Sequence, residues 1–177
     1  MGVRRMRLGE LWVASGLLAS AQVQAALAWQ ARCKCRLGEA AVAMGLLAPE
    51  QLLISLAQQL QVPFIRRGGL ERVPGGMLRC VPARVLARLR VCPLRVEWKN
   101  EVRGVVTVAT SEPGNLGVLD DMAFATGCSV KPVLALADDI EHVLRRNGII
   151  TTRARSLELN PDDANLRLRI SRDHFAY

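Results

Sequence analysis

The sequence predicts an α+β protein in which an N-terminal helical repeat precedes a small α+β module. Residues 7–30 and 36–59 align without a gap and share fourteen of twenty-four positions, and such self-similarity is typical of repeated structural units. After the second copy, short apolar runs alternate with helical patterns. We therefore expect a tandem-motif part at 1–62, an α+β part at 63–148 and a C-terminal extension or linker at 149–177.

Each copy of the repeat is predicted to form two helices joined by a turn. In the first copy, Gly16 marks the end of the first helix, because glycine accepts the left-handed C-cap conformation. Ser20 has the side chain of an N-cap for the second helix. The apolar face of the first helix contains Leu8, Leu11 and Trp12. Leu17 and Leu18 are expected to pack inward, and the stripe of the second helix contains Val23, Leu27 and Gln30.

The second copy repeats this scheme. Gly45 again ends the first helix, and Pro49 occupies a first-turn position where its missing N–H is not needed. The corresponding apolar positions and the final glutamine are Leu37, Leu46, Leu47, Leu52, Leu56 and Gln59. A plain helical hairpin repeat, whose apolar positions form only a core, is one interpretation of this periodicity.

Arg-Leu-Gly begins both copies, at residues 7–9 and 36–38, and we call these two segments the Arg-Leu-Gly openings. Core packing alone requires neither these openings nor a glutamine at the end of both stripes. A helix start has free backbone N–H groups, glycine permits close approach, and arginine adds a charged fork. The openings therefore favour two anion sites, which suit a pseudo-two-fold ligand with two phosphates.

The region after the repeat is predicted to fold in the order strand, helix, hairpin, helix, strand, helix. Alternating apolar and polar residues indicate the strands, and asparagine and glycine delimit one of the helices. The last helix begins with aspartates and ends with arginines, which complements its dipole. The expected elements are a strand at 64–65, a Gly- and Arg-rich hinge loop at 66–76, a helix at 82–91, a hairpin with strands 94–98 and 102–109 around Lys99-Asn100, a helix from Asn115 to Ala125 ended by Gly127, a strand at 130–134 and a helix at 137–146.

The final segment, residues 149–177, gives fewer signals. Pro161-Asp162-Asp163 is typical of a turn, and residues 166–170 alternate like an edge strand. The segment is either a linker or a partner-binding extension.

The chain is basic, with a formal net charge of +8. This charge admits nucleic acid, an acidic membrane face or a phosphate-bearing small ligand as partner, and it also fits a merely solvated surface. Residues 60–110 hold ten basic and three acidic side chains, but only Phe64 and Trp98 are aromatic there. Because no nucleic-acid-binding signature occurs, we expect no nucleic acid polymer as partner.

The N-terminus resembles a signal peptide or a membrane span, because arginines precede a stretch without charge between Glu10 and Arg32. However, Glu10 interrupts the change from basic to apolar residues, and the stretch contains several serines and glutamines. The same pattern recurs in the second copy with Glu39 and Glu50. We therefore expect no membrane span and a cytoplasmic location.

Neither a catalytic nor a metal centre is predicted. The five cysteines form no C-x-x-C and only two histidines occur, so a zinc site or a disulfide framework is not expected. No glycine precedes a lysine, which excludes a P-loop, and neither G-x-S-x-G nor H-E-x-x-H occurs. The adjacent pairs Asp120-Asp121 and Asp138-Asp139 point in different directions on a helix. We expect a protein that is not an enzyme and has no cofactor.

The doubled pattern R-L-G-x(6)-G-L-L-x(8)-L-x-x-Q, with a five-residue spacer, resembles the MshEN domain. This domain forms the N-terminal region of many bacterial type II secretion and type IV pilus ATPases. The resemblance continues through Val106–Pro113 and Leu119–Gly127 and covers about residues 7 to 148. It implies that the chain binds cyclic di-GMP, with each copy holding about half of the ligand and leucines lying against the guanine faces.

The resemblance also implies which residues bind the ligand. They are Arg7, Leu8, Gly9, Leu17, Val23, Leu27, Gln30, Arg36, Leu37, Gly38, Leu46, Leu52, Leu56, Gln59 and Glu112. Val23 replaces a leucine of the family, and the lost methylene is expected to weaken binding by about 1 kcal/mol, or about fivefold. Glu112 stands where the family often has an aspartate, and a solvated turn residue before Pro113 is the alternative role. Trp12 and Ala41 stand where the family prefers an aliphatic residue.

The sequence therefore predicts a free-standing cytoplasmic receptor for the bacterial second messenger cyclic di-GMP, which also has a protein partner. Binding would fix the repeat against the α+β module and so expose or hide a surface for that partner. The alternative is a docking adaptor of a type II secretion or type IV pilus machine that acts through protein contacts without a ligand. Both openings and both final glutamines favour the receptor, because an adaptor needs only the buried leucines.

Overall fold

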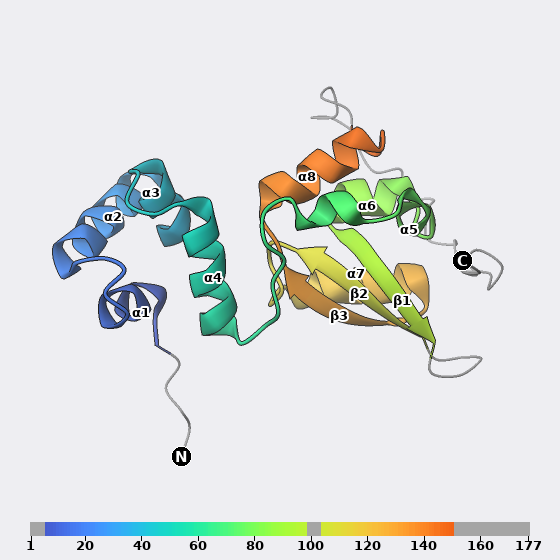
Figure 1. Ribbon diagram of the computed structural model, residues 1–177, viewed down its shortest axis with the longest axis horizontal. Coiled ribbons are helices and arrows are strands. Elements are labelled where there is room, and N and C mark those ends of the chain that lie inside the picture. Colours follow the sequence, from blue (N-terminus) through green and yellow to red (C-terminus); the bar gives the residue numbers. More distant parts are fainter. Residues whose placement is uncertain (1–5, 99–103, 151–177) are drawn as a thin grey trace, which may run out of the picture. The chain divides into compact units, whose positions relative to one another are not determined.

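The computed structural model describes residues 6–98 and 104–150 of the 177-residue chain. The chain divides into two compact units, Met1–Phe64 (unit 1) and Ile65–Tyr177 (unit 2) (Figure 1). The turn predicted at Lys99-Asn100 and the turn and edge strand predicted after residue 150 lie outside the described residues.

The described part of unit 1 consists of two helices from each copy of the repeat. They are α1 (Leu8–Ala14), α2 (Ser20–Cys33), α3 (Leu37–Ala43) and α4 (Pro49–Leu60). The turns that follow α1 and α3 contain Gly16 and Gly45 in the left-handed region, with φ of 71° and 70°. Pro49 is the first residue of α4. The helix–turn–helix prediction is confirmed for both copies.

The predicted N-cap of α2 is wrong, because Ser20 is the first helical residue and Ala19 is the N-cap. The side chain of Gln22 accepts a hydrogen bond from the N–H of Ala19 at 2.8 Å. Gln51 does the same for Ala48 in the second copy, also at 2.8 Å. A glutamine at the third helical position binds the N–H three residues before it, and this interaction sets where the helix begins.

The two copies share one hydrophobic core. Helix α1 packs against α4, and α2 packs against α3, in addition to the packing within each copy. Trp12 is fully buried, and its indole Nε1 has no hydrogen-bond partner among the described residues. The equivalent residue of the second copy, Ala41, is buried in the same cluster. The buried members of this cluster are Trp12, Leu18, Val23, Ala26, Ala41 and Leu47.

Unit 2 is built on a three-stranded sheet with the order β1-β2-β3, in which β1 pairs antiparallel and β3 parallel to the central strand β2. The α+β fold class is therefore confirmed. Its described elements are η1 (Gly69–Arg72), α5 (Gly75–Arg79), α6 (Ala83–Leu89), β1 (Cys92–Trp98), β2 (Gly104–Thr110), α7 (Leu116–Thr126), β3 (Ser129–Leu134) and α8 (Ala137–Arg146).

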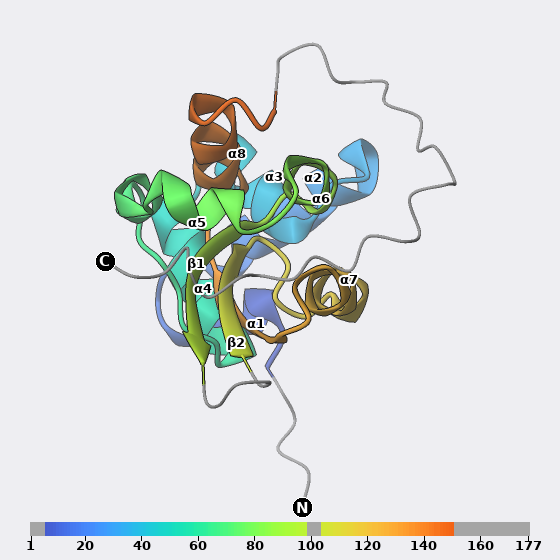
Figure 2. The ribbon, with the colours of Figure 1, turned by 90° about the vertical axis from the view of Figure 1, so that its right-hand side faces the viewer.

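Both faces of the central strand are covered, since all residues of β2 from Val106 to Thr110 are buried. Helix α7 makes the crossover between the parallel strands β2 and β3 and packs against β3 and α6. Helix α8 packs against β1, β2 and η1, while α5 packs against β1 (Figures 1 and 2). None of the described helices of either unit combines the length and the hydropathy that a membrane span needs.

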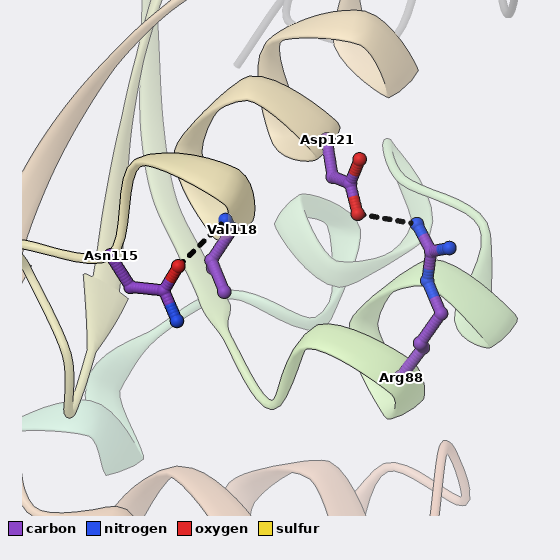
Figure 3. A network of polar contacts seen from close by, with 4 residues as sticks. All are labelled: Arg88, Asn115, Val118 and Asp121. Atoms are coloured by element: carbon purple, nitrogen blue, oxygen red, sulfur yellow. Dashed lines mark hydrogen bonds and ion pairs between the residues drawn. The ribbon is translucent and has the colours of Figure 1, made fainter.

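The ends of α7 confirm two predictions from the sequence. The side chain of Asn115 accepts a hydrogen bond from the N–H of Val118 at 3.4 Å, and Gly127 ends the helix with φ of 65°. An ion pair of 3.0 Å between Arg88 and Asp121 joins α6 to α7 (Figure 3). Both side chains of this pair are about half exposed, so it contributes at most about 1 kcal/mol.

Two elements predicted between residues 64 and 76 are wrong. Phe64 forms only an isolated bridge, although the N–H of Ile65 donates to the carbonyl of Leu134 at 2.9 Å. The apolar run of two residues after Pro63 is too short to continue as a strand. The predicted loop at 66–76 instead contains η1 and the start of α5. Leu70 is buried in the core of unit 2, and its packing there stabilises a helical turn in this segment.

Candidate functional site

Both Arg-Leu-Gly openings lie at the first turn of a helix in unit 1. Arg7 and Arg36 are the N-caps of α1 and α3, have extended backbone and are exposed. The side chains of Glu10 and Glu39 accept hydrogen bonds from the N–H of these arginines, at 2.8 and 2.9 Å. The glutamate of Arg-Leu-Gly-Glu is thus a capping residue, a role that its spacing of three residues from the arginine signals in the sequence.

The packing of the helices brings the end of α4 to the start of α1. The side-chain Nε2 of Gln59 donates a hydrogen bond to the backbone carbonyl of Met6 at 2.9 Å. Gln30, the equivalent residue of the first copy, is half-buried near the end of α2. Both glutamines were predicted to bind the ligand, and the structure gives Gln59 a protein partner beside Arg7.

Gly9 and Gly38 of the openings are buried where helices cross. A Cβ atom on Gly9 would lie 2.8 Å from Cγ1 of Val23, and one on Gly38 would lie 2.7 Å from Cδ1 of Leu52. The close approach that these glycines permit is therefore an approach to the second helix of the same copy. Their predicted contact with the ligand stays a prediction.

Replacing Gly38 by alanine is expected to destabilise the chain by up to about 2 kcal/mol, because overpacking the contact with Leu52 costs about 1–3 kcal/mol and helix propensity returns about 0.5–1 kcal/mol. Gly117 offers a matched control, because it is also the second residue of its helix and a Cβ there would meet only ordinary contacts, the nearest at 3.5 Å. Gly117→Ala is expected to stabilise by about 0.5–1 kcal/mol through helix propensity. Urea unfolding measures both variants, and a stabilising Gly38→Ala would contradict the packing role.

The aliphatic residues predicted to touch the ligand differ in exposure. Leu27 is 39% exposed, whereas Val23 is only 7% exposed and belongs to the core of unit 1. Val23 is shorter than the leucine of the family, and this difference therefore affects the packing of the helices as well as any contact with the ligand. The other predicted positions are half-buried, namely Leu8, Leu17, Leu37, Leu46, Leu52 and Leu56. All of these except Leu56 pack against the shared core.

Glu112 is the one predicted site residue that lies in unit 2, whereas the other fourteen lie in unit 1. It follows β2 and belongs to the turn before α7. Its carboxylate accepts a hydrogen bond from Nδ2 of Asn115 at 3.0 Å, and its N–H donates to Oγ1 of Thr110 at 3.1 Å. These bonds show that Glu112 stabilises the turn before α7, and its ligand contact, which the resemblance implies, stays a prediction.

Unit 2 also contains a cavity of about 300 Å³ that the sequence did not predict. It is lined by Arg90, Ser111, Ala137 and Glu141. Two of its lining residues, Arg90 and Glu141, form an ion pair of 3.0 Å. No sequence motif links these residues, because they come from the residue after α6, the residue after β2 and the first half of α8. Within the described ranges, no group of acidic, cysteine and histidine side chains is arranged to hold a metal ion.

The fold and the site define a two-unit domain, in which a doubled helical motif with an arginine at each opening precedes a small α+β unit. The family model of the MshEN domain matches residues 60–153, just over half of the 177 residues. The chain belongs to the MshEN domain family. The matched segment begins at the end of α4 and covers the described part of unit 2, whereas the resemblance in the sequence starts from the repeat.

Solved structures extend the similarity over both units. One similar structure is that of MshE with cyclic di-GMP (cdg), whose sequence is 28% identical to this chain. The TM-score is 0.65, and the alignment covers 81% of this chain and 99% of the MshE chain. The N-terminal domain of XpsE is 16% identical, with a TM-score of 0.53, and 82% of this chain and 98% of that domain are covered. The likeness to XpsE shows the fold alone. No curated protein matches the chain.

Proposed function

We propose that the chain is a receptor domain for cyclic di-GMP, in which each copy of the repeat binds about half of the ligand. The observation that carries this proposal is the pair of equivalent openings, each with an exposed arginine at the N-cap of a helix. Membership of the MshEN family and the likeness to MshE, solved with cyclic di-GMP, support it.

The chemistry of the openings suits a ligand with two phosphates and two guanines. A helix N-terminus carries partial positive charge and outward N–H groups, and arginine adds a fork of donors for phosphate oxygens. Half-buried leucines next to each opening offer apolar surface to a purine face. Because the copies are related by a repeat, they match a ligand whose two halves are chemically equal.

The proposed role is regulatory and cytoplasmic rather than enzymatic, without metal or cofactor, and nucleic acid polymers are not partners. Ligand binding would change the fit between the chain and a protein partner. The alternative is a docking adaptor of a secretion or pilus machine that needs no ligand. One observation favours protein docking: Leu116 and Phe124, spaced along α7 by eight residues, are 71% and 66% exposed.

Isothermal titration of the full chain with cyclic di-GMP tests the receptor. We expect saturable heat with one ligand per chain and a higher melting temperature, since a ligand at one hundred times its Kd stabilises a protein by about 2.7 kcal/mol. GMP is the matched control, because it supplies only half of the ligand and should bind far more weakly. Absence of both heat and thermal shift would leave the docking adaptor as the better description.

A further inference from the structure

We infer that Gln59 is a positioning residue that holds the backbone before Arg7 and so couples this arginine to the end of α4. The inference rests on the proposed function in treating Arg7 as a ligand contact. It changes the role of Gln59 from a direct ligand contact to a residue that acts through Arg7.

The peptide unit between Met6 and Arg7 is held from both sides. Its carbonyl accepts a hydrogen bond from Nε2 of Gln59 at 2.9 Å, and its N–H donates to Oε2 of Glu10 at 2.8 Å. One side chain comes from α4 and the other from α1. Both polar groups of a single peptide unit at the start of the described chain are thus fixed, and with them the direction in which the Arg7 side chain leaves the backbone.

The second copy lacks half of this arrangement. Glu39 binds the N–H of Arg36 at 2.9 Å, as Glu10 does for Arg7. However, among the described residues the side-chain amide of Gln30, the equivalent of Gln59, makes no such hydrogen bond to the carbonyl of Cys35, the equivalent of Met6. Helix α2 continues for three residues beyond Gln30 to Cys33, whereas α4 ends at Leu60, directly after Gln59. The two copies therefore differ in this hydrogen bond, which Gln59 makes and Gln30 does not.

Gln59 also lies where unit 1 ends. Helix α4 stops at Leu60, and Gln61 caps it in the left-handed region with φ of 56°. The N–H groups of Gln61 and Val62 both donate to the carbonyl of Ala57. A ligand that orders Arg7 would therefore also order, through Gln59, the last turn of α4, which leads into the boundary between the units. This gives ligand binding a physical route to the connecting segment.

The first experiment measures amide hydrogen exchange in the ligand-free full chain. Gln59→Leu is expected to speed exchange at Arg7, because the clamped peptide unit is released, and a change of about fivefold corresponds to one net hydrogen bond. Gln30→Leu is the matched control and should leave exchange at Arg36 unchanged. Gln59→Glu keeps the shape but removes the donor, and it should behave like Gln59→Leu. If Gln30→Leu speeds exchange at Arg36 as much as Gln59→Leu does at Arg7, or if neither variant changes exchange, the inference is overturned.

The second experiment is a double-mutant cycle on the Kd of cyclic di-GMP. Gln59→Leu is expected to weaken binding about fivefold in the native chain and in Arg36→Ala, but to have no further effect in Arg7→Ala. Saturating ligand should also slow exchange over residues 57–62 in the native chain, but not in Gln59→Leu. An undiminished effect of Gln59→Leu in Arg7→Ala would make Gln59 a direct contact. If the native chain binds no ligand, the proposed function fails, whereas the ligand-free exchange still decides the role of Gln59.

Discussion

Replacing Arg7 and Arg36 together by alanine is expected to abolish binding of cyclic di-GMP and to leave the fold intact. Both side chains are exposed, and the capping bonds to Glu10 and Glu39 use the backbone N–H of each arginine, which alanine retains. A hydrogen bond to a charged group contributes about 1.5–3 kcal/mol, so losing two weakens binding by roughly a hundredfold to ten-thousandfold. Titration calorimetry measures the affinity, and circular dichroism and the melting temperature report on the fold.

The control must separate a specific contact from the general positive field of the chain. Arg66 and Arg67 are exposed arginines of unit 2, and their replacement by alanine removes the same two charges. This second variant is expected to change affinity by less than about threefold at 0.15 M salt, because neither residue belongs to the proposed site and salt screens exposed charges. If affinity survives in Arg7→Ala/Arg36→Ala, or falls equally in both variants, the site is misassigned.

Trp12→Ala is expected to have the largest effect on stability. Trp12 is fully buried in the core that both copies share, and replacing such a residue by alanine leaves a cavity that costs about 3–5 kcal/mol. That loss is a large part of the stability of a typical domain. Urea unfolding, followed by far-ultraviolet circular dichroism, should show a lower midpoint.

Trp12→Phe distinguishes the size of this side chain from its polar group. The buried indole Nε1 has no acceptor within the described chain, and an unsatisfied buried donor costs about 1–3 kcal/mol. Phenylalanine removes that donor while it keeps most of the ring, so the two changes offset each other and the variant should lose less than about 1.5 kcal/mol. A loss as large as that of Trp12→Ala would mean that the indole N–H has a partner in the folded protein.

The predictions that the structure confirms rest on local signals. Asn115 and Gly127 delimit α7, and Pro49 begins α4, because each of these residues acts on the backbone within one turn of its own position. At the first turn of α2, the local signal of a single residue is not sufficient. Ser20 has the usual side chain for an N-cap, yet the interaction of Gln22 with Ala19 shifts the start of the helix.

The features that the sequence did not predict depend on contacts between distant residues. The helical turns in place of the loop at 66–76 follow from the burial of Leu70, which only the assembled core of unit 2 provides. Gln59 and Met6 are 53 positions apart, so no local pattern reveals their hydrogen bond. The glycines of the openings were found from the repeat, but their packing against Val23 and Leu52 requires the crossing helices.

The pairing of a large and a small side chain at Trp12 and Ala41 bears on the history of the repeat. These positions are equivalent in the two copies, and both are buried in one cluster. A chain rebuilt from two first copies would have to fit two indole rings into that space, and a chain rebuilt from two second copies would leave it hollow. The two copies are therefore no longer interchangeable in the core, although their sequences still align.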